Sequence, residues 1–385
     1  MRGGISVRKK LWIIGYLCIV VTALSLIAFK TISVDPFFHF HAPKTDIYYY
    51  RLNNQRSQND GITRNFDYEG IITGTSMTEN FKTSEAEVLF GVRFIKVPYS
   101  GGSFKEINSS LERAALYNQN LKYVIRSLEM YFFCDDKDRM RTDLGQYPDY
   151  LYDDNLFNDV KYIFNRDVLF TRVYPMTKEN DKTGFKGGIP TFDDYSNWMA
   201  KYKFGYQVVL PDGLTAKEAS KPIALSQNEI ERIKTNVRQN VTAIAEQHPN
   251  ITFYCFFAPF SAVWWRTQLL NGKLDWQIDT ERVVIEELLK HDNIKLFSFN
   301  TLFDITTDLN NYKDATHYGE WVNSLMLRYM YDGKCQITRE NFLTYLETER
   351  QFYGSYDYTQ LINQEDYEDD YLAAAIINDN PNSPA

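Results

Sequence analysis

The stretch Tyr68-Glu69-Gly70-Ile71-Ile72-Thr73-Gly74-Thr75-Ser76-Met77 decides the fold that we expect for this chain. It is typical of a short apolar strand that breaks at a glycine and leaves Ser76 on a turn. In α/β proteins such turns lie at the carboxyl edge of a parallel sheet, where hydroxyl nucleophiles are commonly exposed.

Downstream of this turn, short apolar runs alternate with helical patterns. Further strands are expected at residues 92–97, 123–128, 251–257 and 294–299, and helices at 104–115, 230–244 and 281–290. Ser226-Gln227-Asn228-Glu229 is a capping-box pattern that opens one of these helices. Strand–helix alternation of this length predicts a three-layer α/β/α fold with a central parallel sheet covered on both faces.

The amino-terminal part contains 19 uncharged residues, 11–29, which is long enough to cross a bilayer. Basic residues precede this run, which favours an uncleaved signal anchor with a cytoplasmic amino terminus. A cleaved signal peptide and a buried core helix are the alternatives. The sequence thus predicts a single-pass protein of the cell membrane whose carboxyl-terminal domain is extracytoplasmic.

The charge balance bears on the possible partners. The 385 residues carry 42 Lys+Arg and 50 Asp+Glu, a net charge of −8, and the first 30 residues hold five basic groups and no acid. The remainder is therefore strongly acidic, which disfavours nucleic acid as a partner. The four cysteines form no disulfide framework, and no Cys/His cluster has metal-ligand spacing, so we expect neither a metal nor a bound cofactor.

Composition divides the chain into three parts. Residues 1–33 form a basic stub and the anchor, 34–350 the extracytoplasmic domain, and 351–385 an acidic polar tail that we expect to be flexible. Residues 135–221 interrupt the strand–helix rhythm and are interpreted as an insertion. Its aromatic residues either pack against the core or stack on a sugar: Tyr147, Tyr150, Tyr152, Trp198 and Tyr202.

Asp314-Ala315-Thr316-His317, near the carboxyl end, supplies the two partners that a serine nucleophile needs. The other four histidines lie beside the anchor or at helix ends: His39, His41, His248 and His291. Two alternatives stay open for Ser76, a helix cap and a phosphate-binding turn, although the turn lacks a Gly-Lys-Ser/Thr sequence. Asp314 has the alternative of capping the helix after His317.

The Gly-Thr-Ser turn and the distant Asp-x-x-His resemble those of the SGNH (GDSL-type) hydrolases. The likeness extends over residues 35–330 and is greatest to membrane-anchored members used in cell-envelope acylation, such as the D-alanyl-lipoteichoic acid biosynthesis and alginate O-acetylation proteins. The resemblance implies that Ser76 is the nucleophile, His317 the base and Asp314 the orienting acid. It also implies that the backbone N–H groups of Ser76 and Gly102 form the oxyanion hole.

One part of the sequence departs from this family. After the third expected strand the family offers Gly-x-Asn-Asp, whose asparagine binds the oxyanion, whereas this chain has Ser127-Leu128-Glu129-Met130. The family likeness implies a serine esterase or O-acyltransferase acting on acetyl or D-alanyl esters of a cell-envelope polysaccharide or teichoic-acid-like polymer. The alternative is a non-catalytic glycan-binding or scaffold partner of an integral-membrane acyltransferase.

Overall fold

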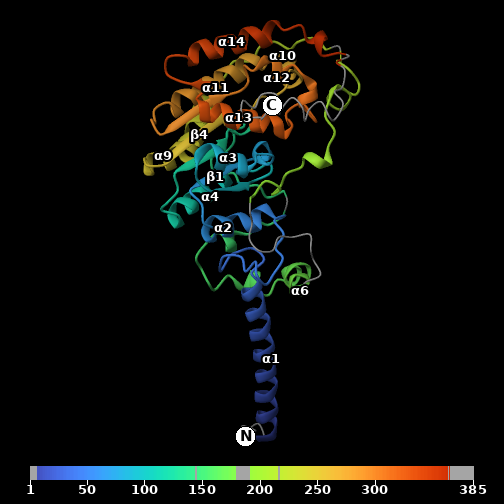
Figure 1. The fold of residues 1–385 in the computed structure, drawn as a ribbon, viewed down its shortest axis with the longest axis vertical. Helices are drawn as coiled ribbons and strands as arrows, with labels where there is room; N and C mark the ends of the chain where they lie inside the picture. The colour runs from blue at the N-terminus through green and yellow to red at the C-terminus, as the bar shows by residue number, and fades with distance from the viewer. Residues whose placement is uncertain (1–6, 144, 179–190, 216, 363, 365–385) are drawn as a thin grey trace, which may run out of the picture. The chain divides into compact units, whose positions relative to one another are not determined.

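A computed structural model of the chain describes residues 7–143, 145–178, 191–215, 217–362 and 364 (Figure 1). A six-stranded sheet, in the order β2-β1-β3-β4-β5-β6, forms its centre. The strands are β1 Gly70–Gly74, β2 Phe94–Pro98, β3 Tyr123–Ser127, β4 Thr252–Phe257, β5 Ile294–Ser298 and β6 Gln336–Ile337. The first five are parallel and β6 is antiparallel to β5, which confirms the expected α/β class.

Helices cover both faces of this sheet, as the alternating pattern predicts. The longer helices are α1 Val7–Val34, α2 Gln55–Asn65, α3 Thr83–Phe90, α4 Phe104–Tyr117, α8 Gln227–Val237, α9 Ala243–Gln247, α10 Ala262–Leu270, α11 Leu274–Leu288, α13 Glu320–Asp332 and α14 Phe342–Ser355. On one face of the sheet α3 contacts both β2 and α13. On the other face α4 contacts α9, and α11 contacts α8 and α14 (Figure 1). Four-residue helices are α5 Val160–Ile163, α6 Tyr174–Thr177, α7 Tyr206–Val209 and α12 Phe303–Thr306.

The helix after Ser226 has the capping box and the buried apolar face that its sequence predicts. Both hydrogen bonds of the capping box form between Ser226 and Glu229, and they satisfy amide donors that the first turn of a helix would leave unpaired. The expected apolar face is buried at Ile233, Val237, Val241 and Ile244. A wider, π-type turn at Arg238–Thr242 separates α8 from α9, so the predicted single helix is divided.

The chain forms two compact units. Unit 1 comprises Met1–Phe66 and Gln146–Pro190, and unit 2 comprises Asp67–Gly145 and Thr191–Ala385. The sheet lies in unit 2, and the segment interpreted as an insertion contributes residues to both units. By sequence, unit 1 holds 15 basic and 10 acidic residues, so the acidic excess belongs to unit 2. The expected boundary between the anchor, which ends at residue 33, and the extracytoplasmic domain, which begins at residue 34, stays a prediction.

The carboxyl-terminal boundary needs a correction. A polar tail was expected from residue 351, but α14 continues to Ser355 and is followed by a 3-10 turn at Tyr358–Leu361. The polar composition conceals three anchoring side chains: Tyr353, Tyr358 and Leu361 are buried, and Tyr353 donates a hydrogen bond of 2.6 Å to the carbonyl of Asn300. The acidic residues from Glu365 onward, like Arg2 in the basic stub, lie outside the described residues.

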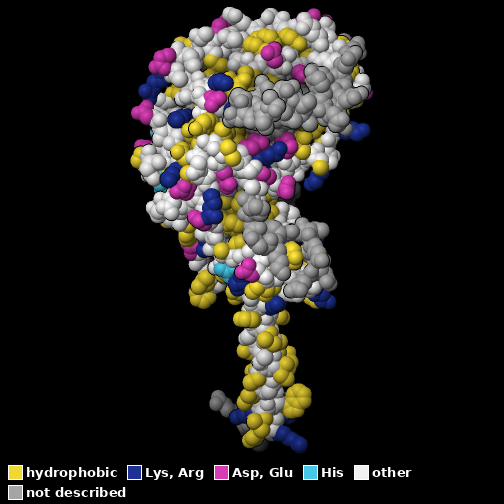
Figure 2. Space-filling model, viewed as in Figure 1, with side chains coloured by type: hydrophobic (Ala, Val, Ile, Leu, Met, Phe, Trp, Pro, Cys, Tyr) yellow, Lys and Arg dark blue, Asp and Glu magenta, His cyan; other side chains and the backbone are white. Residues whose placement is uncertain are grey.

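Helix α1 is the only helix in the described parts of the chain that is long and apolar enough to cross a membrane. Its hydrophobic side chains are exposed over most of its length (Figure 2). This argues against the alternative of a core helix, because a core helix would be buried. The exposed apolar surface fits either a membrane anchor or a signal sequence.

Candidate active site

Ser76 follows β1 at a point where the sheet reverses its strand order. The chain leaves β1 for β2 on one side and later returns to β3 on the other, and ligands of doubly wound sheets bind at such switch points. β1 ends at Gly74, which has a φ of +149°, a conformation that favours glycine. A side chain at Gly74 would also collide with Ser127 of β3, so glycine permits the close approach of the two strand ends.

The turn itself leaves the Ser76 side chain free of a capping role. Thr75 caps the short 3-10 turn Ser76–Thr78, because its Oγ1 accepts a hydrogen bond from the N–H of Met77 at 3.4 Å. The α-helix that follows begins only at Thr83, so Ser76 does not cap an α-helix, which was one of its alternative roles. Thr75 thus takes the capping role that the sequence left open for Ser76.

The structure brings together the three side chains that the sequence singled out. Ser76 Oγ and His317 Nε2 are 2.8 Å apart, although the two residues are 241 positions apart in the sequence. On the other side of the ring, His317 Nδ1 lies 2.9 Å from Asp314 Oδ2 and 3.0 Å from Oδ1. With the ring proton on Nδ1, the imidazole donates to Asp314 and its Nε2 accepts from the Ser76 hydroxyl. This is the hydrogen-bond order of a nucleophile, a base and an orienting acid.

Asp314 is held in its charged form. Burial disfavours ionisation, but the hydrogen bond and charge of His317 and the N–H groups of Thr316 and His317 outweigh it, so the pKa of Asp314 lies well below its usual value. These two N–H groups donate to Oδ1 at 2.9 and 2.8 Å. The following helix α13 begins after Gly319 and has no side-chain cap, so Asp314 closes the loop and does not cap the helix.

Gly102 requires a correction. Its N–H was assigned to the oxyanion hole, but it donates a hydrogen bond of 2.6 Å to the carbonyl of Tyr99. This bond closes a tight turn in which Gly101 has a φ of +56°. A side chain at Gly102 would collide with Tyr99, so packing within the turn accounts for this glycine. Among the described residues, no acceptor is bonded to the N–H of Ser76, which keeps the proposed oxyanion role open for that group alone.

Glu129 is a site residue that sequence reasoning missed. It stands where the family that the sequence resembles has an asparagine. Its Oε1 accepts a hydrogen bond of 2.7 Å from Thr75 Oγ1 and another from Ser127 Oγ. Ser127 Oγ in turn accepts from the N–H of Thr75 at 3.3 Å. Burial raises the pKa of Glu129, because a charged carboxylate is poorly solvated there. The Ser-x-Glu sequence after a strand was the available signal.

Asn323 was also missed. It is buried on α13, and its Nδ2 donates a hydrogen bond of 3.1 Å to the carbonyl of Met77. The helix that follows His317 therefore holds the turn that follows Ser76. This contact links the two halves of the site in addition to the hydrogen bond between the side chains.

Trp198 and Tyr202, two of the aromatic residues with open roles, lie beside the triad residues. The Trp198 ring meets His317 edge-on at 5.9 Å between centroids. Lys313 Nζ lies 4.4 Å from the centroid of Trp198 and 3.8 Å from that of Tyr202, and it is 3.7 Å from Asp314 Oδ2. The two rings thus contact a cation.

The other three aromatic residues of this set lie in unit 1. The rings of Tyr147 and Tyr152 contact each other at 5.3 Å, and Lys161 lies over Tyr150 at 6.0 Å. These contacts support a packing role for Tyr147, Tyr150 and Tyr152, which was the first of the two alternatives. Among the described residues, no group of three or more His, Cys, Asp or Glu is arranged to hold a metal ion.

Comparison with known proteins adds a distant likeness of fold. No family model and no curated protein matches the chain. A solved structure described as a "putative platelet activating factor from Streptococcus pneumonia" is similar over 72% of this chain and 90% of its own, with 10% sequence identity and a TM-score of 0.35. A likeness at this level supports no argument about activity, so the case for function depends on the geometry of the site.

Proposed function

We propose that this protein is a serine hydrolase or acyltransferase whose nucleophile is Ser76. The observation that carries the proposal is the continuous hydrogen-bond chain from Ser76 Oγ to His317 Nε2 and from His317 Nδ1 to Asp314. Hydroxyl nucleophiles are weak at neutral pH and need an adjacent base that a third group orients. The location of the triad, at the switch point of a parallel sheet, is where such a site would meet a substrate.

The proposed reaction has two steps. First, Ser76 Oγ attacks the carbonyl carbon of an ester while His317 Nε2 takes its proton. The ester C–O bond breaks, and the alcohol departs with the proton from His317, which leaves an acyl-serine. In the second step a water molecule or a sugar hydroxyl attacks this acyl group, and its proton passes through His317 back to Ser76 Oγ. Asp314 stabilises the imidazolium formed in both steps.

The finer assignment extends this chemistry to the cell envelope. We propose that α1 is an uncleaved membrane anchor, that the triad lies outside the cytoplasm, and that the substrate is an acetyl or D-alanyl ester of an exported polysaccharide or teichoic-acid-like polymer. The apolar surface of α1 and the basic residues before it support the anchor. The likeness of the motifs to SGNH-type proteins of envelope acylation supports the substrate class.

A second candidate is a non-catalytic glycan-binding or scaffold protein that assists an integral-membrane acyltransferase. It is favoured by the N–H of Gly102, which is engaged with Tyr99, and by Glu129, which stands in place of an oxyanion-binding asparagine. Losing one oxyanion donor lowers kcat on the order of a hundredfold or more. A scaffold would tolerate such a loss, whereas an enzyme would turn over slowly.

Covalent labelling distinguishes the two. The full chain in detergent is treated with a fluorophosphonate probe, and the modified peptide is identified by mass spectrometry. The proposed enzyme is labelled at Ser76, labelling disappears in Ser76→Ala, and it is strongly reduced in His317→Ala. Ser261→Ala is a control, since Ser261 donates to the Ala315 carbonyl rather than to a base. Absence of labelling in a folded wild-type protein would favour the scaffold.

A further inference from the structure

Unit 1 exposes a group of large apolar side chains on its surface. Phe157 is 90% exposed and Phe170 67% exposed. The whole group lies within residues 156–174 and consists of Leu156, Phe157, Val160, Phe164, Phe170 and Tyr174. Concentrations of exposed apolar residues of this kind mark a site of interaction.

These residues belong to short elements that pack around the carboxyl end of α1. α5 and the π-type turn Val168–Val173 both contact α1. The Thr31 hydroxyl, in the last turns of α1, donates a hydrogen bond of 3.1 Å to the carbonyl of Ile163. Figure 2 shows hydrophobic side chains on unit 1 next to this end of α1.

Tyr162 fastens the same elements to the residues that follow α1. Its side chain is fully buried, its hydroxyl donates to Asp35 Oδ1 at 2.8 Å and accepts from the N–H of Phe37 at 3.1 Å. The Asp35 carboxyl also accepts from the N–H groups of His39 and Phe40, at 3.0 and 2.7 Å. The exposed group is thus held at a fixed height relative to the end of α1.

That height corresponds to the surface of a bilayer. The 28 residues of α1 span about 42 Å at 1.5 Å per residue, whereas the hydrocarbon layer is about 30 Å thick. The uncharged run ends at Phe29 and Lys30 is the first charge after it. Thr31 and the elements bonded to it consequently lie at the level of the lipid headgroups, where aromatic residues are enriched in membrane proteins.

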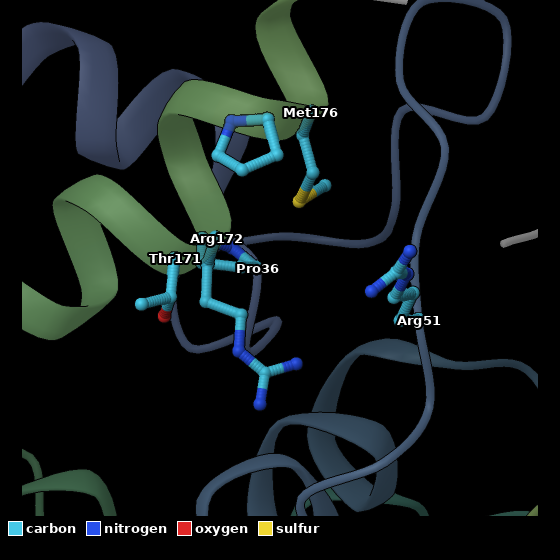
Figure 3. A pocket seen from close by; sticks show the side chains of 6 residues that line it. Pro36, Arg51, Thr171, Arg172 and Met176 are labelled. Carbon is cyan, nitrogen blue, oxygen red and sulfur yellow. The ribbon is translucent and has the colours of Figure 1, made fainter. Parts of the chain in front are cut away.

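Basic side chains accompany the apolar group. Arg51 and Arg172 line a small hollow together with Pro36 and Met176 (Figure 3). Burial lowers the pKa of Arg172, and the charge of Arg51 lowers it further, so a neighbouring anion would be favourable there. Lys178 is exposed at the end of the same segment. Basic groups beside apolar ones are typical of surfaces that lie on a membrane.

We propose that residues 156–178 form a membrane-surface collar, in which Phe157, Phe170 and Tyr174 insert among the lipid headgroups around the carboxyl end of α1 while Arg172 and Lys178 face the lipid phosphates. The collar rests on the membrane anchoring proposed above and not on the chemistry of Ser76. It gives unit 1 a second attachment to the bilayer beside α1 itself.

The test measures how deeply labelled residues lie in the bilayer. The full chain is reconstituted in vesicles of phosphatidylglycerol and phosphatidylcholine. The four native cysteines are replaced by alanine, and one environment-sensitive label is placed at Phe170→Cys. The reference sites are Ile19→Cys in α1 and Leu343→Cys, which is exposed on α14. Lipids with a quencher near the headgroup should quench the label at 170 most strongly. Lipids with a deep quencher should quench the label at 19, and neither should affect the label at 343.

The outcomes separate the collar from the anchor. A quenched label at 19 with an unquenched label at 170 overturns the collar and leaves the anchor intact. An unquenched label at 19 overturns the anchor and the collar together. If the cysteine-free chain does not fold, hydroxyl-radical footprinting of the unmodified protein in the same vesicles gives the answer. Phe157, Phe170 and Tyr174 should then be oxidised less than Leu343, and equal oxidation would overturn the collar.

Discussion

The hydroxyl of Thr75 donates a hydrogen bond of 2.7 Å to the buried carboxyl of Glu129, which joins the residue before the proposed nucleophile to the end of the neighbouring strand. The carboxyl also accepts from Ser127, so one side chain holds both strand ends that flank the site. Burial raises the pKa of Glu129, and the hydrogen bonds from Ser127 and Thr75 oppose this shift.

Glu129→Gln should therefore be tolerated and Glu129→Ala should not. Glutamine keeps an acceptor for Thr75 and Ser127, whereas alanine leaves both donors buried, at a cost of about 1–3 kcal/mol in the free energy of unfolding. Because the folded pKa is raised, this carboxyl stabilises the wild type at low pH, and the contribution is lost as pH rises through the folded pKa. Urea unfolding at several pH values should show the wild type losing stability relative to Glu129→Gln as pH increases. Parallel profiles would mean that Glu129 is ionised in the folded protein.

Variants of the triad should be non-additive in esterase activity toward a small activated acetyl ester. Ser76→Ala and His317→Ala should each remove nearly all activity, and the double variant should be little worse, because in the proposed mechanism the two residues act as one catalytic unit. Asp314→Asn should retain more activity, since an amide still holds the ring but favours the wrong tautomer. The measurement is kcat and KM for the full chain, and additive losses in the double variant would contradict the shared role.

Lys96 should make stability depend on pH. It is buried in β2, and its Nζ donates to the carbonyls of Glu79, Phe81 and Asp193 at 2.6, 2.8 and 3.0 Å. Burial lowers its pKa to about 7. Between that value and the ordinary lysine pKa of about 10.4, the unfolded chain binds more protons than the folded one, so the free energy of unfolding rises with pH.

Lys96→Met should remove this rise and lower stability, since the buried carbonyls around Nζ lose their donor. The matched control is Lys122→Met, because Lys122 is exposed and pairs only with Glu69 at the surface. Urea unfolding across neutral and mildly alkaline pH measures both variants. If Lys96→Met keeps the slope of the wild type, Lys96 is charged throughout the range in the folded protein.

The proposed orientation of the anchor predicts on which side of the membrane a carboxyl-terminal reporter is active. A reporter that requires export should be active when fused after Ala385, and one that folds only in the cytoplasm should be inactive. The physical reason is the basic cluster before the uncharged run, because such clusters favour a cytoplasmic amino terminus. Replacing Arg8, Lys9 and Lys10 by glutamate should weaken this preference. Activity of the cytoplasmic reporter alone would overturn the envelope-substrate proposal.

The parts of this fold that were predictable from sequence are those with a strong local signal. The strand before Ser76 and the capping box at Ser226 each depend on residues close together in the chain, and the structure confirms both. β6 is only two residues long and α10 carries Trp264 and Trp265 without an amphipathic period, so neither has a readable pattern. The positions of β6 and α10 depend on packing against residues far away in the chain, so they cannot be predicted from a local stretch of sequence.

The residues of the candidate site also fall into those that the sequence could predict and those that it could not. Ser76, Asp314 and His317 were singled out because a nucleophile and its partners require particular residue types, and the structure brings their side chains together. Their catalytic roles stay a prediction. Gly102 was assigned wrongly, since a glycine next to the site does not reveal whether its N–H is already bonded. Glu129 and Asn323 were missed because their importance lies in contacts with residues tens or hundreds of positions away.

The separation of 241 positions between Ser76 and His317 also determines when, during export, the proposed activity could begin. In a chain that crosses the membrane starting from its anchor, Ser76 emerges well before His317. A serine without its base is a poor nucleophile, so a chain that has exported only Ser76 carries no working site. The protein would become reactive only once the segment that carries His317 had been exported, and thus never toward esters on the side where it is made.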